Sequence, residues 1–230
     1  MQLIEDLYAA FADVAKPTQL KGCQLGCCMP KEDEDALLAQ SLNHSDPEIL
    51  WHYITDAIWT VGNKHDFKYF VPRLLELGLT EKEFSHGGNF ISFPVTFGKK
   101  LALADFDEWP EVQRRFVDEA IYQIMIEEAR RKDFYSFSGW MCAICNINLD
   151  KNRYLDFLDS DAGSEARDDF MVNEREAYKH GRMEGPFWDE LDVEKTSPIY
   201  EWLVARKDQS NIALGKHRRA QRAKREKRRY

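Results

Sequence analysis

The sequence lacks the features that mark membrane-spanning and secreted proteins. No apolar run approaches the ~18–20 residues that a bilayer span requires. Residues 1–6 contain neither a basic segment nor an apolar one, so we predict no secretion signal. The five cysteines are an odd number, which without such a signal fits free thiols in a reducing compartment. We therefore expect a cytoplasmic protein with no membrane contact.

Recognisable catalytic motifs are missing as well. The chain contains no GxxxxGK[ST] or GxGxxG phosphate loop, no HExxH zinc motif, no Gly-x-Ser-x-Gly elbow and no EF-hand loop. We predict no catalytic residue and no cofactor. A helical enzyme of unrecognised type stays open as an alternative, because catalytic groups from distant helices converge only in the fold.

The cysteines offer a weak zinc site as a further alternative. Cys23 and Cys27 lie in a glycine-containing loop, and Cys142 and Cys145 form a CxxC within a helical pattern. Zinc prefers four tetrahedral sulfur or nitrogen ligands, which these four thiolates would supply. The spacing is poor for such a site, and the competing interpretation makes Cys142 and Cys145 small buried side chains.

Strand-like segments are scarce. The one candidate, residues 89–97, is interrupted by Pro94, and one strand cannot form a sheet. Elsewhere apolar residues recur at helical spacing, and Asp46-Pro47 and Ser197-Pro198 are helix-start signals. At Pro72 we expect a kink or a new helix. The expected helices cover residues 46–62, 66–78, 110–131, 134–147, 151–159 and 197 into the C-terminal tail, with weaker ones over 2–14, 32–40, 95–104 and 164–179.

These elements predict an all-α protein. We expect a single irregular helical domain over residues 1–215, built from antiparallel helical hairpins, of which 46–78 and 108–159 are candidates. Stacking of the hairpins as in a repeat protein is an alternative, although the two segments share no sequence similarity. Residues 216–230 would form a basic C-terminal tail or an extension of the last helix.

Charge is distributed very unevenly along the chain. Residues 216–230 hold nine Lys or Arg and one Glu, a net charge of +8. Because the whole chain carries −8, residues 1–215 carry −16. Residues 159–194 are the most acidic part, with twelve Asp or Glu against four Lys or Arg. An acidic body attracts basic proteins, whereas a basic tail attracts nucleic acid. The alternative interpretation is that both charged segments are simply solvated surfaces.

Part of the chain resembles a group of uncharacterised bacterial helical proteins. The similarity is carried by Tyr8-Ala-Ala-Phe11, the cysteine cluster at 22–28, Tyr53 with Thr60-Val-Gly62, and residues 66–77, and again by residues 141–155. The resemblance implies a mostly α fold and a bacterial setting. It implies no activity, cofactor or catalytic residue.

The first functional hypothesis is a non-enzymatic acidic protein that neutralises a basic partner. A bacterial immunity protein that covers the cationic cleft of a toxic nuclease is the concrete version. We expect exposed carboxylates of 159–194 to bind the partner, with two aromatic side chains as anchors. The predicted residues are Asp161, Glu165, Asp168, Asp169, Glu174, Glu176, Phe187, Trp188, Asp189, Glu190 and Asp192.

The second hypothesis is a nucleic-acid-associated protein that acts through its basic tail. Lysine and arginine would contact phosphates, and the lack of an aromatic residue before Tyr230 argues against base stacking. The predicted residues are Arg218, Arg219, Arg222, Lys224, Arg225, Lys227, Arg228 and Arg229.

Overall fold

The computed structural model describes residues 2–22, 28–81, 84, 93–131 and 134–227. Within these ranges it contains twelve α-helices and no strand, which confirms the all-α prediction. Phe93 to Phe97, the described part of the strand-like segment, lies in a helix; residues 89–92 fall outside the described residues. None of the described helices combines the length and the apolarity needed to cross a bilayer.

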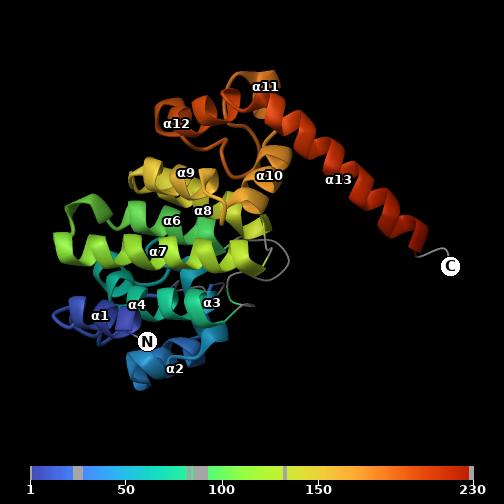
Figure 1. Ribbon diagram of the computed structural model, residues 1–230. Coiled ribbons are helices and arrows are strands. Elements are labelled where there is room, and N and C mark those ends of the chain that lie inside the picture. The colour runs from blue at the N-terminus through green and yellow to red at the C-terminus, as the bar shows by residue number, and fades with distance from the viewer. Residues whose placement is uncertain (1, 23–27, 82–83, 85–92, 132–133, 228–230) are drawn as a thin grey trace.

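The helices form three groups that follow the order of the chain (Figure 1). The first group is α1 (Gln2–Ala10), α2 (Lys31–Ala39), α3 (Pro47–Asp56) and α4 (Lys64–Thr80). The central group is α6 (Phe93–Leu103), α7 (Glu111–Arg131) and α8 (Phe134–Asn146). The last group is α9 (Lys151–Asp159), α10 (Ser164–Asn173), α11 (Ala177–His180), α12 (Val193–Val204) and α13 (Lys207–Lys227). Helix lengths range from 4 to 21 residues without regular alternation, so repeat-like stacking is not confirmed.

The centre of the molecule is the contact between α6 and α8. Every residue from Phe137 to Cys145 is buried, and Trp140 packs edge-on against Phe93, with ring centroids 5.7 Å apart. Gly98 allows the two helices to approach closely, because a Cβ at that position would lie 2.6 Å from the Cα of Ala143. The uncharged sequence of α8 fits a helix enclosed on all sides.

Capping residues determine where the early helices begin. The Asp46 carboxylate accepts hydrogen bonds from the backbone N–H groups of Glu48 and Ile49, with Pro47 at the first helical position. In α4, Asn63 is the N-cap and Asp66 completes a capping box. This helix therefore begins at Lys64, before the predicted start at Asp66.

One prediction about these helices is wrong, and one of the two alternatives predicted at Pro72 is excluded. Helix α3 ends at Asp56 rather than at Gly62, because Ile58 adopts a positive φ of 70° and the chain turns there. Helix α4 does not restart at Pro72 but continues through it. Proline loses one backbone hydrogen bond inside a helix, and the burial of Phe70, Val71 and Leu74 offsets that loss.

The C-terminal segment also differs from the prediction. Helix α12 begins at Val193, so Pro198 lies inside it rather than at its first position. A turn at Ala205 and Arg206 separates α12 from α13, so the helix that contains Pro198 does not run on into the tail. Residues 216–227 belong instead to α13.

Candidate functional site

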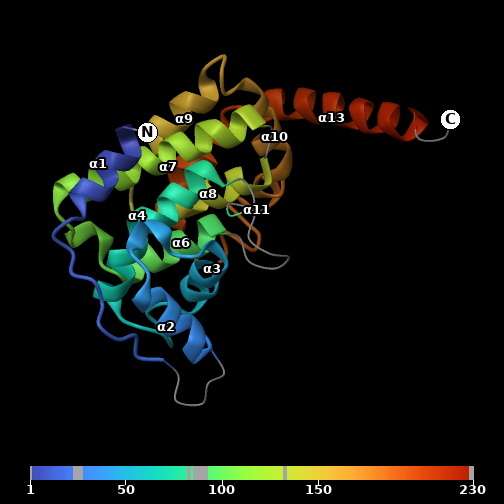
Figure 2. The ribbon, with the colours of Figure 1, turned by 90° about the horizontal axis from the view of Figure 1, so that it is seen from below.

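Helix α13 is the feature that stands apart from the rest of the molecule. Figures 1 and 2 show its C-terminal half pointing away from all other helices. Its 21 residues correspond to a length of ~31 Å at 1.5 Å per residue. The N-terminal half packs on α10, where Ala213 is buried and the Ser210 hydroxyl donates to the carbonyl oxygen of Met171 at 3.2 Å. One half of the helix is thus anchored, and the other extends away from the remaining helices.

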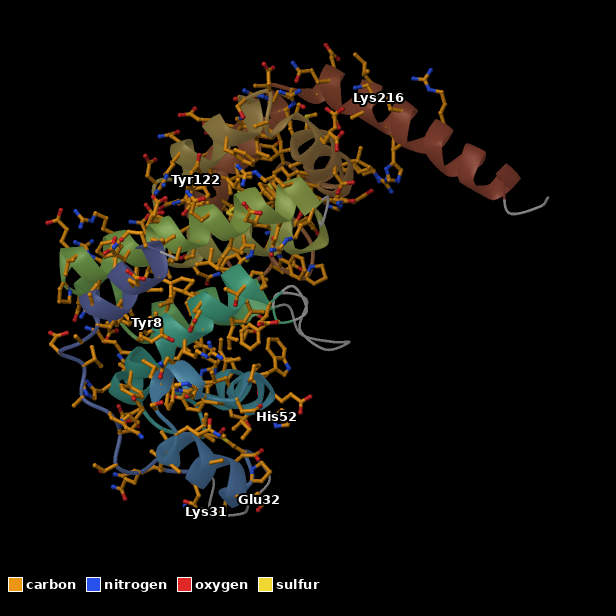
Figure 3. All side chains as sticks on the ribbon, turned by 60° about the horizontal axis from the view of Figure 1, so that its bottom comes forward. Tyr8, Lys31, Glu32, His52, Tyr122 and Lys216 are labelled. Carbon is orange, nitrogen blue, oxygen red and sulfur yellow. The ribbon has the colours of Figure 1, made fainter. Side chains whose placement is uncertain are left out.

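An ion pair lies where α13 leaves the body. Figure 3 shows the position of Lys216 on α13. The Lys216 ammonium is 2.9 Å from an Asp168 carboxylate oxygen. Burial raises the pKa of the neighbouring Asp169, against the opposing effects of Asn173 and His217. A groove of about 410 Å³ runs between the two helices, and it is lined by Glu165, Asp168, Asp169, Val172, Ala213, Lys216 and His217. The acidic segment of the chain therefore meets the beginning of the basic one.

Beyond this ion pair the basic residues continue along α13. Arg218 and Arg219 are exposed and form no ion pair with any described residue. Four more predicted residues lie along the same helix backbone: Arg222, Lys224, Arg225 and Lys227. The predicted residues Arg228 and Arg229 fall outside the described residues. The structure thus places six of the eight basic candidates on one projecting helix.

The acidic candidates are less uniform than predicted. Asp161, Glu165, Asp189, Glu190 and Asp192 are exposed, as expected. Several candidates already have a basic partner within the molecule: Lys99 lies 2.5 Å from Glu190, and Lys179 lies 2.6 Å from Glu176, whose pKa it lowers. Part of the predicted acidic face is therefore neutralised internally.

Two members of this set are not on the surface at all. Glu174 and Trp188 are only 7% and 3% exposed, so their prediction as surface contacts is wrong. The Trp188 indole donates to the Glu174 carboxylate at 2.9 Å. Burial raises the pKa of Glu174 to about 7. The pair fastens the segment around Trp188 to the end of α10, while Phe187 is half-buried.

The two cysteines of the CxxC segment are buried side chains, whereas Cys28 is half-buried. Cys142 and Cys145 are fully buried on α8, and burial raises the pKa of both thiols to about 12. The Cys142 thiol donates to the carbonyl oxygen of Phe187 at 2.7 Å. Cys23 and Cys27 fall outside the described residues. Among the residues that are described, no group of three or more His, Cys, Asp or Glu side chains is placed to hold a metal ion.

A buried lysine was not predicted from the sequence. Lys100 is 0% exposed, and its ammonium donates to the carbonyl oxygen of Ala57 at 2.6 Å and lies 3.5 Å from the ring centroid of Trp59. Burial lowers its pKa to about 8, against the opposing charge of Asp56. Its helical register was a usable signal, because Lys100 falls on the same face of α6 as Phe93 and Phe97.

A second missed cluster joins α7 to α9. The Arg153 guanidinium contacts the carboxylates of Asp118 and Glu119 and stacks on Tyr122, 3.9 Å from its ring centroid. Tyr154 donates to Asp118 at 2.5 Å. Every charged group in this cluster has a partner, as expected for a contact that holds two helices together.

Comparisons with known proteins add no relative. No protein-family model matches the chain, and no curated protein or solved structure is similar enough to count as a match.

Proposed function

We propose that the protein is a non-enzymatic cytoplasmic protein that binds nucleic acid through helix α13. The remaining helices form the folded body on which this helix is anchored. One observation carries this proposal: a strongly basic helix stands clear of an acidic body (Figures 1 and 2). Segment 216–227 of this helix contains seven Lys or Arg and a single Glu. Phosphate contacts by such side chains supply most of the affinity of nonspecific nucleic-acid binding.

Distance explains how an acidic protein can bind a polyanion. At physiological ionic strength, charge interactions are screened over roughly 8 Å. Lys216, which is paired with Asp168, marks the edge of the body. The eleven residues from there to Lys227 extend the helix by ~16 Å. Repulsion from the body, whose residues carry −16, is therefore largely screened at the outer turns.

A salt titration tests this proposal. Binding of a labelled mixed-sequence nucleic acid is measured by fluorescence anisotropy for the full chain and for a chain ending at Gly215. We expect binding by the full chain only. If five phosphates are neutralised, the slope of log K against log salt concentration will be about −4.5. Equal binding by the shortened chain, or no binding by either chain, contradicts the proposal.

A conservative variant serves as the control for charge. Arg218→Lys combined with Arg219→Lys keeps both charges at exposed positions, so it should retain the slope. Arg218→Gln combined with Arg219→Gln should reduce the slope by about 1.8, or 0.9 for each lost phosphate contact.

A second candidate function is the binding of a basic protein partner. It is favoured by the exposed carboxylates of Asp161 and Asp192, which form no ion pair with any described residue. The groove beside α10 also already accommodates a lysine of the same chain. The cationic cleft of a toxic nuclease, with this protein as its bacterial immunity protein, is one such partner.

Charge reversal tests that second function. The full chain and the variant Asp161→Lys, Asp189→Lys and Asp192→Lys are compared as affinity baits in extracts of the native cells. A stoichiometric basic protein that is retained by the unmodified chain and lost by the variant supports this function. Equal retention by both baits removes these carboxylates from the interface.

A further inference from the structure

We infer that the nucleic acid bound by α13 is duplex DNA, and that residues 218–227 of the helix lie in its major groove. This inference rests on the proposed function and narrows its ligand to one class. The observations that carry it are the continuous helical backbone through Lys227, the placement of charged residues around that helix, and the anchoring of its N-terminal half on α10.

The dimensions of the helix fit this groove. An α-helix with its side chains is roughly 10–12 Å across, and the major groove of B-form DNA is about 12 Å wide and 8.5 Å deep. Residues 218–227 form nearly three turns that extend ~15 Å. The major groove of duplex RNA is deep and narrow and does not admit side chains in this way.

The composition of α13 disfavours single strands. Proteins that bind single-stranded nucleic acid stack successive bases on aromatic side chains, at about 1–3 kcal/mol per base. Residues 207–227 contain no Phe, Tyr or Trp. The helix offers positive charge without a stacking surface, and duplex DNA requires no stacking because its bases are already paired.

The register of the basic residues suits a ligand that flanks the helix on two sides. At 100° per residue, Arg218, Arg222 and Arg225 occupy one side of the helix. Lys224 and Lys227 lie about 120° and 180° away from Arg218, and Arg219 lies about 100° away in the other direction, so basic positions are found on every side of the helix. A helix lying along a single phosphate backbone needs cations on only one side, whereas a helix in the major groove has a phosphate backbone on either side.

Anchoring prepares the helix for binding. Short helices are marginal in isolation because their nucleation is unfavourable. Here the N-terminal half of α13 is already folded against α10 through Ala213 and Ser210, so the outer turns propagate from an existing helix. Part of the ordering cost is therefore met before DNA is bound.

The test compares four probes on the full chain in 0.1 M salt: a 20-base-pair mixed-sequence DNA duplex, the RNA duplex of the same sequence, and the two corresponding single strands. We expect the DNA duplex to bind at least tenfold more tightly than each of the others. Equal or tighter binding of RNA or of either single strand overturns the inference while leaving nucleic-acid binding itself in place. No binding of any probe overturns both.

Two variants separate helix geometry from charge. Ala223→Pro keeps every charge but interrupts the helix, so it should remove the preference for the DNA duplex; Ala223→Ser, which keeps the helix, is its control. Arg222→Gln with Arg225→Gln should weaken duplex DNA binding about 60-fold in 0.1 M salt, or about eightfold per lost phosphate contact. A duplex preference that survives Ala223→Pro overturns the groove assignment, and circular dichroism checks that each variant remains folded.

Discussion

Helices α8 and α13 show two different ways of stabilising the same backbone geometry. The residues of α8 from Phe137 to Cys145 are all buried, and this stretch contains no charged side chain. The C-terminal half of α13 extends away from the other helices (Figure 1), but Ala, Arg, Lys, Gln and Glu, which predominate there, are strong helix formers. Packing maintains the first helix, and intrinsic propensity together with one anchored end maintains the second. Substitutions should therefore have very different consequences in the two regions.

The largest effect is expected in the core. Trp140→Ala should lower the free energy of unfolding by about 3–5 kcal/mol, because it leaves a cavity between α6 and α8. It also removes the indole that donates to the buried Glu128 carboxylate at 3.1 Å. Ile212→Ala on α13 is the matched control, since Ile212 is 61% exposed and its loss should cost less than about 0.5 kcal/mol. Urea denaturation measures the free energy of unfolding of both variants. Similar losses at the two sites would mean that α8 and α13 do not differ in how much packing stabilises them.

The buried Glu174 carboxyl should make the stability of the folded body depend on pH. The folded state raises the pKa of Glu174 to about 7, above its ordinary value of 4.5, so the folded protein retains a proton that the unfolded chain has lost. The free energy of unfolding should therefore fall as pH rises from about 4.5 through 7, by up to about 3 kcal/mol in total.

Glu174→Gln should abolish this decline and keep an oxygen acceptor for the Trp188 indole. The variant should be more stable than the original protein at pH 8 and similar to it at pH 5. The exposed Asp161→Asn is the control. Thermal unfolding between pH 5 and 8 is the measurement, and parallel curves for the original protein and Glu174→Gln would refute the assignment.

Two helical glycines give opposite predictions. Gly98→Ala places a methyl group against the Ala143 backbone, where both helices are held by packing, and should destabilise the fold by about 1–3 kcal/mol. Gly215→Ala in α13 meets nothing within 4 Å and should stabilise the protein by up to about 1 kcal/mol through helix propensity. Denaturant unfolding measures the change in the free energy of unfolding for each variant. Destabilisation by Gly215→Ala would mean that this part of α13 is more closely packed than the structure shows.

Local signals in the sequence predicted the fold class better than they predicted surfaces. The Asp46-Pro47 start and the helix after Trp109-Pro110 follow from side-chain chemistry within a few residues. Burial of Glu174 does not, because its indole partner lies fourteen residues away across a turn. An acidic segment was interpreted as an acidic face because composition does not show which carboxylates turn inward.

The candidate site likewise has one property that follows from the sequence and one that does not. The basic character of residues 216–227 was evident from the sequence, whereas the direction of α13 was not. That direction depends on the packing of Ala213 and Ser210 on α10, where the Ser210 hydroxyl donates to the carbonyl oxygen of Met171, 39 residues away along the chain. Helical periodicity carries no information about such tertiary contacts.

The smallest expected effect concerns the boundary between body and projecting helix, where Lys216 meets Asp168. The two side chains are 63% and 32% exposed, so water and salt screen their attraction. A double-mutant cycle with Asp168→Asn and Lys216→Gln should give a coupling energy below about 1 kcal/mol in urea denaturation.

The same ion pair should affect DNA binding more clearly than stability. Asp168→Asn frees the Lys216 ammonium to contact a phosphate and removes a nearby negative charge. We expect this variant to bind duplex DNA several-fold more tightly, while Asp161→Asn, on the turn after α9, should change affinity less. A coupling energy well above 1 kcal/mol, or weaker DNA binding by Asp168→Asn, would mean that the ion pair itself holds α13 in its binding position. The anchored part of the helix would then extend to Lys216, and the contrast with α8 would apply only to the turns beyond it.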